Sequence, residues 1–173
     1  MLLDPDIFLL EKKLESGKAS LDDRLRLATL YLDRGYWDYA MQECILMMQD
    51  NQPTPLPLME LVSDLFIHGQ RNQEAMLFMS NIVNVDPSYK PNKIRFNMGL
   101  CAARVGNLQE AKESLAKLIK EDPEYPQAKA MLKGIKLVET HNYHASAEKM
   151  ARRPVFSDKP SLIQRIFGFL RRD

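Results

Sequence analysis

The chain has 173 residues, of which 45% are hydrophobic and 27% are charged, and it carries a formal net charge of +1 at neutral pH. This is the balance of an ordinary soluble globular protein, without the basic excess that nucleic-acid binding requires. The first residues lack the basic start and apolar core of a signal peptide, and no stretch approaches the roughly 20 apolar residues of a membrane-spanning helix. We therefore expect a cytoplasmic protein that does not bind nucleic acid.

Residues 1–20 are predicted to contain an N-terminal capping helix. Asp4 followed by Pro5 is typical of a helix start, with the aspartate as N-cap and the proline at the first helical position. Ile7, Leu10 and Leu14 then form one apolar stripe. We expect this stripe to cover the end of the elements that follow.

A repeated pattern occupies the centre of the chain. Segments 35–40, 69–75 and 106–111 each begin with glycine and end with alanine, and the alanines lie 35 and 36 residues apart. A proline follows each segment at a similar distance, at Pro53, Pro87 and Pro123. An apolar helical pattern both precedes and follows each segment, so each unit is predicted to be a pair of helices joined at the glycine and stopped by the proline.

Small residues recur where the paired helices should touch. Ala28, Ser63 and Gly99 lie on the first helices, and Ala40, Ala75 and Ala111 lie on the second helices. Such residues admit close approach, while larger apolar residues at helical spacing fill the rest of the seam. Each pair would expose an apolar face that only a neighbouring pair can cover, so the units should stack.

This pattern resembles the tetratricopeptide repeat family over about residues 21–125, in units 21–54, 56–90 and 92–125. The third unit matches best, with its glycines, alanine and proline in register, although the early tryptophan common in such repeats is missing from all three units. In the second unit one extra residue separates Gly69 from Ala75, so we expect a different turn there. The resemblance implies an all-α fold, a right-handed α-solenoid of stacked antiparallel helix pairs with capping helices.

Residues 126–140 are predicted to form the C-terminal capping helix, which brings the expected number of helices to eight. Its inward positions are Ala128, Met131, Leu132, Ile135 and Val138. Lys129, Lys133 and Lys136 line its other side, as the polar outer face of a terminal cap requires.

Beyond this helix, residues 141–160 are polar and contain two prolines, which indicates a flexible linker. Residues 161–173 then form a basic amphipathic pattern, in which six apolar residues fall within an arc of about 160° and the arginines fall opposite. The tail residues predicted to bind a surface are Leu162, Ile163, Arg165, Ile166, Phe167, Phe169, Leu170, Arg171 and Arg172. Two interpretations stay open: a helix on the inner face of an anionic membrane, or a helix docked on its own groove or on another subunit.

No residues with catalytic spacing are recognisable. The sequence has no Gly-rich phosphate loop and no convincing metal-ligand set, because His141 and His144 lie in the polar linker without neighbouring ligands. Cys44 and Cys101 lie in apolar helical patterns and are predicted to be buried thiols. The methionines of the first two units suit core packing, with an adaptable binding surface as the alternative. We expect no enzyme activity, cofactor, metal or small-molecule substrate.

The resemblance implies that the first helices line a concave groove that binds a partner protein or peptide. The predicted groove residues are Leu25, Thr29, Leu32, Asp64, Ile67, His68, Lys93, Phe96, Asn97, Leu100 and Arg104, together with Asp22, Asp33 and Glu60. Repeats of this family that grip the acidic ends of heat-shock chaperones use a clamp of Lys and Asn side chains. Lys93 and Asn97 match part of it, but Leu25 and Thr29 stand where the first unit needs Lys and Asn. A groove anchored by apolar side chains suits an extended or helical peptide better.

The sequence therefore predicts a non-enzymatic adaptor that binds a partner peptide, with the tail placing it at a membrane surface or a complex. The alternative is a chaperone similar to the class II chaperones of type III secretion, which shield client proteins but are acidic and lack a basic tail. Neither the partner nor the oligomeric state follows from the sequence.

Overall fold

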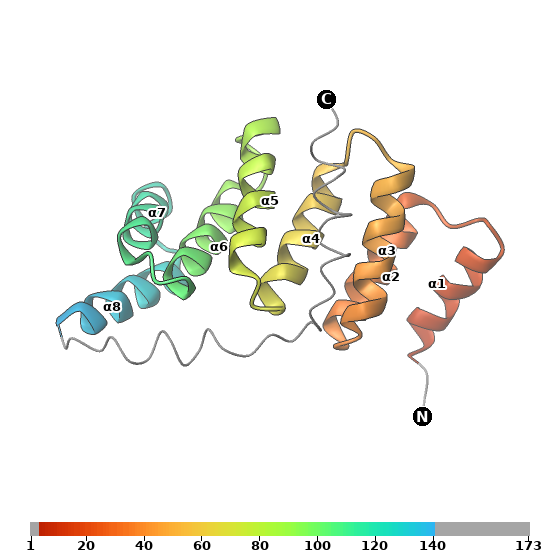
Figure 1. Ribbon diagram of the computed structural model, residues 1–173, viewed down its shortest axis with the longest axis horizontal. Coiled ribbons are helices and arrows are strands. Elements are labelled where there is room, and N and C mark those ends of the chain that lie inside the picture. Colours follow the sequence, from red (N-terminus) through yellow and green to blue (C-terminus); the bar gives the residue numbers. More distant parts are fainter. Residues whose placement is uncertain (1–3, 141–173) are drawn as a thin grey trace. The chain divides into compact units, whose positions relative to one another are not determined.

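The computed structural model describes residues 4–140, and these residues form eight α-helices and no strand (Figure 1). They fall into two compact units, one ending at Leu65 and the other beginning at Phe66, so that the boundary lies within α4 (Leu56–His68). The predicted linker, 141–160, and the predicted tail helix, 161–173, lie outside the described residues.

The first unit contains α1 (Pro5–Glu15), α2 (Leu21–Asp33), α3 (Trp37–Asp50) and the greater part of α4. Asp4 caps α1 by accepting a 3.0 Å hydrogen bond from the backbone N–H of Asp6, and Pro5 is the first helical residue, as predicted. In this unit α2 packs against both α1 and α3. The hydroxyl of Tyr31 donates to Glu11 Oε1 at 2.6 Å, which ties α2 to α1.

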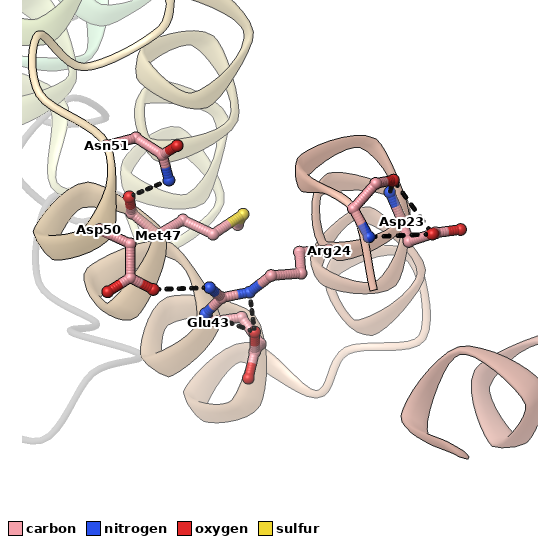
Figure 2. Close-up of polar contacts among 7 residues, drawn as sticks. Asp23, Arg24, Glu43, Met47, Asp50 and Asn51 are labelled. Atoms are coloured by element: carbon pink, nitrogen blue, oxygen red, sulfur yellow. Dashed lines mark hydrogen bonds and ion pairs between the residues drawn. The ribbon is translucent and has the colours of Figure 1, made fainter. Parts of the chain in front are cut away.

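Polar contacts hold the start of α2 against α3 (Figure 2). Ser20 and Asp23 form a reciprocal capping box at the first turn of α2, which satisfies backbone N–H groups that the helix itself leaves unpaired. One residue later, Arg24 donates from Nη1 to Asp50 Oδ2 at 2.8 Å and from Nε and Nη2 to Glu43 Oε2 at 3.3 Å. These bonds join the start of α2 to two successive sites along α3.

The second unit contains the last turn of α4, α5 (Asn72–Val85), α6 (Pro91–Arg104), α7 (Leu108–Glu121) and α8 (Pro126–Thr140). Within it α6 packs against both α5 and α7, and α7 also packs against α8. A buried cluster joins α6, α7 and α8 through Ala102, Ala111, Leu115, Leu118, Ala128 and Ile135.

The small residues predicted at the helix seams are buried. A Cβ atom on Gly99 would lie 3.1 Å from Leu115 Cγ and 3.5 Å from the carbonyl oxygen of Ala111, so α6 and α7 approach closely there. Ala28 and Ser63 on the other first helices are fully buried, as are all three alanines on the second helices. The α6–α7 seam therefore forms where the sequence placed it, and the small residues predicted for the other pairs are buried.

The turn between the paired helices corrects one expectation. Gly35 and Gly106 adopt left-handed φ angles of +78° and +87°, and in α4–α5 the corresponding residue is Gln70, with φ of +59°. The same hydrogen bond closes all three turns, from the N–H of Tyr36 to Tyr31 O at 2.7 Å, of Arg71 to Phe66 O at 2.8 Å and of Asn107 to Ala102 O at 2.9 Å. The second turn is thus the same as the others, and only its glycine lies one position early.

The sulfur-containing side chains lie mostly in the core, as predicted. Cys44 and Cys101 are buried free thiols. Met41, Met47, Met48, Met59 and Met79 are buried as well, and Met76 is half-buried against the cluster of the second unit, so these methionines serve core packing. In α8, Ile135 is buried as predicted, but Val138 is 40% exposed.

Candidate partner-binding site

Predicted groove residues of the second unit lie mostly along one side of α6. Lys93, Phe96, Asn97 and Leu100 are half-buried, and Arg104 is exposed. Their spacing of three and four residues places them on one face of the helix. Pro91 starts this helix at its first position, where the missing N–H leaves no bond unmade.

Two of the predicted residues meet at the ends of α4 and α6. Nη1 of Arg104 donates a hydrogen bond of 3.1 Å to the carbonyl oxygen of Ile67. A guanidinium is favoured at this place because the last carbonyls of a helix have no partner within the helix and carry its negative dipole end. Ile67 is half-buried and His68 exposed beside it, so this corner presents apolar and cationic groups together.

Phe96 has a second role. Its ring centroid lies 5.5 Å from that of Tyr125, in the turn between α7 and α8, and it packs against the buried cluster of the unit. Replacement of Phe96 would therefore loosen the cluster as well as alter the surface. Leu100, four residues later on the same face, is the cleaner position at which to test binding.

In the first unit, the predicted residues differ in exposure. Thr29 is exposed, with its hydroxyl donating to Leu25 O at 2.8 Å, and Leu25 and Asp64 are half-buried. Leu32 is only 9% exposed and Glu60 only 5% exposed. Little of either side chain is therefore accessible to a ligand.

A surface groove that the sequence did not predict lies on the other side of α6. It has a volume of about 800 Å³, with α6 as its floor and α5 and α7 as its walls. Its apolar lining includes Val83, Ile94 and Met98, and its charged lining includes Arg95 and four residues of α7. Periodicity could not reveal this groove, because it depends on how far α5 and α7 stand apart across α6.

Residues 4–140 offer little for chemistry. No group of three His, Cys, Asp or Glu side chains in this part of the chain could hold a metal ion. Burial raises the pKa of the Cys101 thiol to about 12 and raises the pKa of Cys44 as well, so both stay protonated and unreactive at neutral pH. The same residues include no helix whose length and apolar character would let it cross a bilayer.

The helix pairs, their small-residue seams and the repeated glycine or glutamine turn define an all-α solenoid of the tetratricopeptide-like class, and this predicted fold class is confirmed. Solved structures of MamA share the fold. One, described as the crystal structure of MamA, has 14% sequence identity and a TM-score of 0.66, over 99% of this chain and 100% of that chain. MamA MSR-1 C2 has 16% identity and a TM-score of 0.65, over 92% and 86% of the two chains. MamA AMB-1 P212121 has 17% identity and a TM-score of 0.63, over 91% and 86%.

At such identities the likeness to MamA shows the fold alone. No family model matches the chain, and no curated protein matches it.

Proposed function

We propose that this chain is a non-enzymatic interaction module that binds a peptide segment of a partner protein along its first helices. In the second unit the binding surface is the exposed side of α6 together with the end of α4. The contact between Arg104 and Ile67 O carries the proposal, because it holds a cation and an apolar side chain next to each other at the surface.

The chemistry of this surface describes the peptide. Ile67 and Leu100 are half-buried and offer apolar anchor points, while Lys93 and Arg104 add positive charge on the same side of α6. A peptide with apolar side chains at helical or extended spacing, flanked by a carboxylate, complements this arrangement.

The test is capture of partners from cells that make the full chain, followed by binding of the identified partner to purified protein. Leu100→Glu places a carboxylate among the anchors and should reduce recovery by about tenfold or more. Leu46→Glu is the matched control, since Leu46 is an exposed leucine on the second helix of a pair, 39% accessible. A partner recovered equally with both variants would show that recognition lies elsewhere on the molecule.

We propose further that residues 161–173 place the module on an anionic membrane surface. The support is the separation of six apolar residues from the arginines around a helical wheel. Full-length protein should co-sediment with liposomes containing anionic lipid, whereas a chain ending at Pro160 should not. Equal sedimentation of the two proteins would exclude this role and favour docking of the tail on protein. No observation on residues 4–140 favours the secretion-chaperone alternative.

A further inference from the structure

The outer face of α7 carries a charge pattern that the proposed peptide site does not use. Glu110 and Glu113 lie in the first half of the helix, and Lys117 and Lys120 lie in the second half. All four line the groove on the far side of α6 from the proposed peptide site. At 100° per residue, they fall within an arc of about 80°, so they form a single stripe.

This stripe is symmetric about position 115. Glu113 and Lys117 are equally distant from it, as are Glu110 and Lys120, and the small residues Ser114 and Ala116 lie on either side of it. If two copies of α7 cross antiparallel about a two-fold axis at this level, Glu113 of each copy meets Lys117 of the other, and Glu110 meets Lys120. A two-fold interface requires such self-complementarity.

None of these four side chains forms an ion pair within the described part of the chain. Glu110 and Glu113 each accept a hydrogen bond from a neutral amide, of Asn107 at 2.6 Å and of Gln109 at 2.7 Å. Within residues 4–140 neither lysine is paired with a carboxylate. By contrast, Arg95 in the same groove already pairs with Glu121.

The surroundings allow a second helix to approach. Ser114 and Ala116 are the small residues that flank the stripe at this level, and Leu115 is fully buried, so no large side chain blocks the crossing. Across the groove, Val83 is 39% exposed and can contact apolar atoms of an incoming surface. The volume of about 800 Å³ beside α7 accommodates side chains of the second copy.

We propose that the chain forms a two-fold symmetric dimer through antiparallel contact of α7 with α7 of a second copy. The symmetry of the charges favours this occupant over others. A ligand with one sign of charge would be repelled by half of the stripe, and the arginines of the 161–173 tail would meet Lys117 and Lys120 as well as the two glutamates. The dimer surface lies on the opposite side of α6 from the proposed peptide site, so each proposal can be tested independently of the other.

Sedimentation velocity of the full chain tests the dimer, from about 1 µM to about 300 µM at low salt. The unaltered chain should dimerise in this range, and added salt should weaken the dimer. Glu113→Lys and Lys117→Glu should each raise the dissociation constant of the dimer by about tenfold or more. Each variant puts like charges opposite one another at two symmetric sites. The control is Lys133→Glu, at an exposed position of α8, and this variant should leave the dissociation constant of the dimer unchanged.

Complementation makes the test specific. An equimolar mixture of the Glu113→Lys and Lys117→Glu chains should form a mixed dimer, since each altered side chain then meets an opposite charge. The double variant Glu113→Lys/Lys117→Glu should dimerise with itself for the same reason. A monomeric unaltered chain over the whole range, single variants that dimerise normally, or a mixture that stays monomeric would each overturn the proposal.

Discussion

Glutamine at position 70 adopts a backbone conformation that L-residues with a Cβ atom rarely take. Its φ of +59° places it in the left-handed region, where glycine occupies the two corresponding turns. A side chain there costs roughly 1–2 kcal/mol, whereas glycine is free of this penalty.

We therefore expect Gln70→Gly to raise the free energy of unfolding by about 1 kcal/mol, measured by urea denaturation followed by circular dichroism. Gln73→Gly is the control, because Gln73 lies within α5, where glycine should destabilise by about 1 kcal/mol. Loss of stability in Gln70→Gly would mean that contacts of the glutamine side chain outweigh its backbone strain.

Asn72 is a second residue that departs from its counterparts. It is the first residue of α5, where the two other second helices begin with Trp37 and Leu108. Asn72 is 9% exposed, and within the described residues its Oδ1 accepts no hydrogen bond. The nitrogen of the same amide donates to Gln70 O at 3.1 Å, which ties the first residue of α5 to the turn.

At the scale of the elements, one arginine holds the first helix of a pair to the second. Arg24 on α2 contacts Glu43 and Asp50 on α3, and the first two side chains are only 15% and 12% exposed (Figure 2). In the third repeat Arg95 and Glu121 occupy the places of Arg24 and Asp50 and form an ion pair as well. The contact therefore recurs in two of the three repeats, since the second repeat has Met59 and Val85 at these places.

Replacement of the arginine should show how much this contact stabilises the fold. Arg24→Met leaves the Glu43 carboxylate largely buried without its cation, and should lower the free energy of unfolding by about 2 kcal/mol. The double variant Arg24→Met/Glu43→Leu should recover most of this loss, because apolar pairs replace buried ion pairs well.

The control for this series is Arg26→Met, because Arg26 is 67% exposed and lies 3.7 Å from Asp6. An exposed pair of this kind contributes less than about 1 kcal/mol. The free energy of unfolding of each variant is measured by urea denaturation. Equal decreases in Arg24→Met and Arg26→Met would show that burial of the Arg24 network adds no stability.

At the scale of the whole molecule, ionisation should narrow the pH range of stability from both sides. Burial raises the pKa of Cys101 to about 12, from an ordinary value of 9.0, and raises that of Cys44 too. Above pH 9 the unfolded chain loses these thiol protons while the folded chain keeps them, so stability falls as the pH rises. Hydrogen bonds lower the pKa of Asp4, Asp23 and Asp86 below 3.8, so the stability that they contribute is lost as the pH falls through that region.

The urea midpoint should therefore be highest near neutral pH and decline between pH 9 and 11. In Cys44→Ala/Cys101→Ala this alkaline decline should be smaller, although the midpoint at pH 7 will also be lower because small cavities remain. An unchanged alkaline slope in the double variant would contradict the contribution of the thiols. Tyr31, whose pKa is raised by burial and by its bond to Glu11, accounts for the decline that persists.

Most of the fold followed from the sequence because its signals are local. Glycine, proline and the spacing of apolar residues determine where helices begin and end, and small residues such as Gly99 mark where two helices touch. The glycines alone do not mark the second turn, because Gly69 lies one residue before the left-handed position that Gln70 occupies. Alignment on Ala40, Ala75 and Ala111 instead would have placed Gln70 opposite Gly35 and Gly106.

The candidate site followed only in part. Helical periodicity placed Lys93, Phe96 and Leu100 on one face of α6, because that depends on a single helix. The sequence by itself determined the helix pairs and the small residues that become buried in them. Only the tertiary structure decided that Phe96 packs on Tyr125, that Leu32 is buried and that a groove opens between α5 and α7. These facts depend on distances between helices, which packing sets and which no spacing along one helix records.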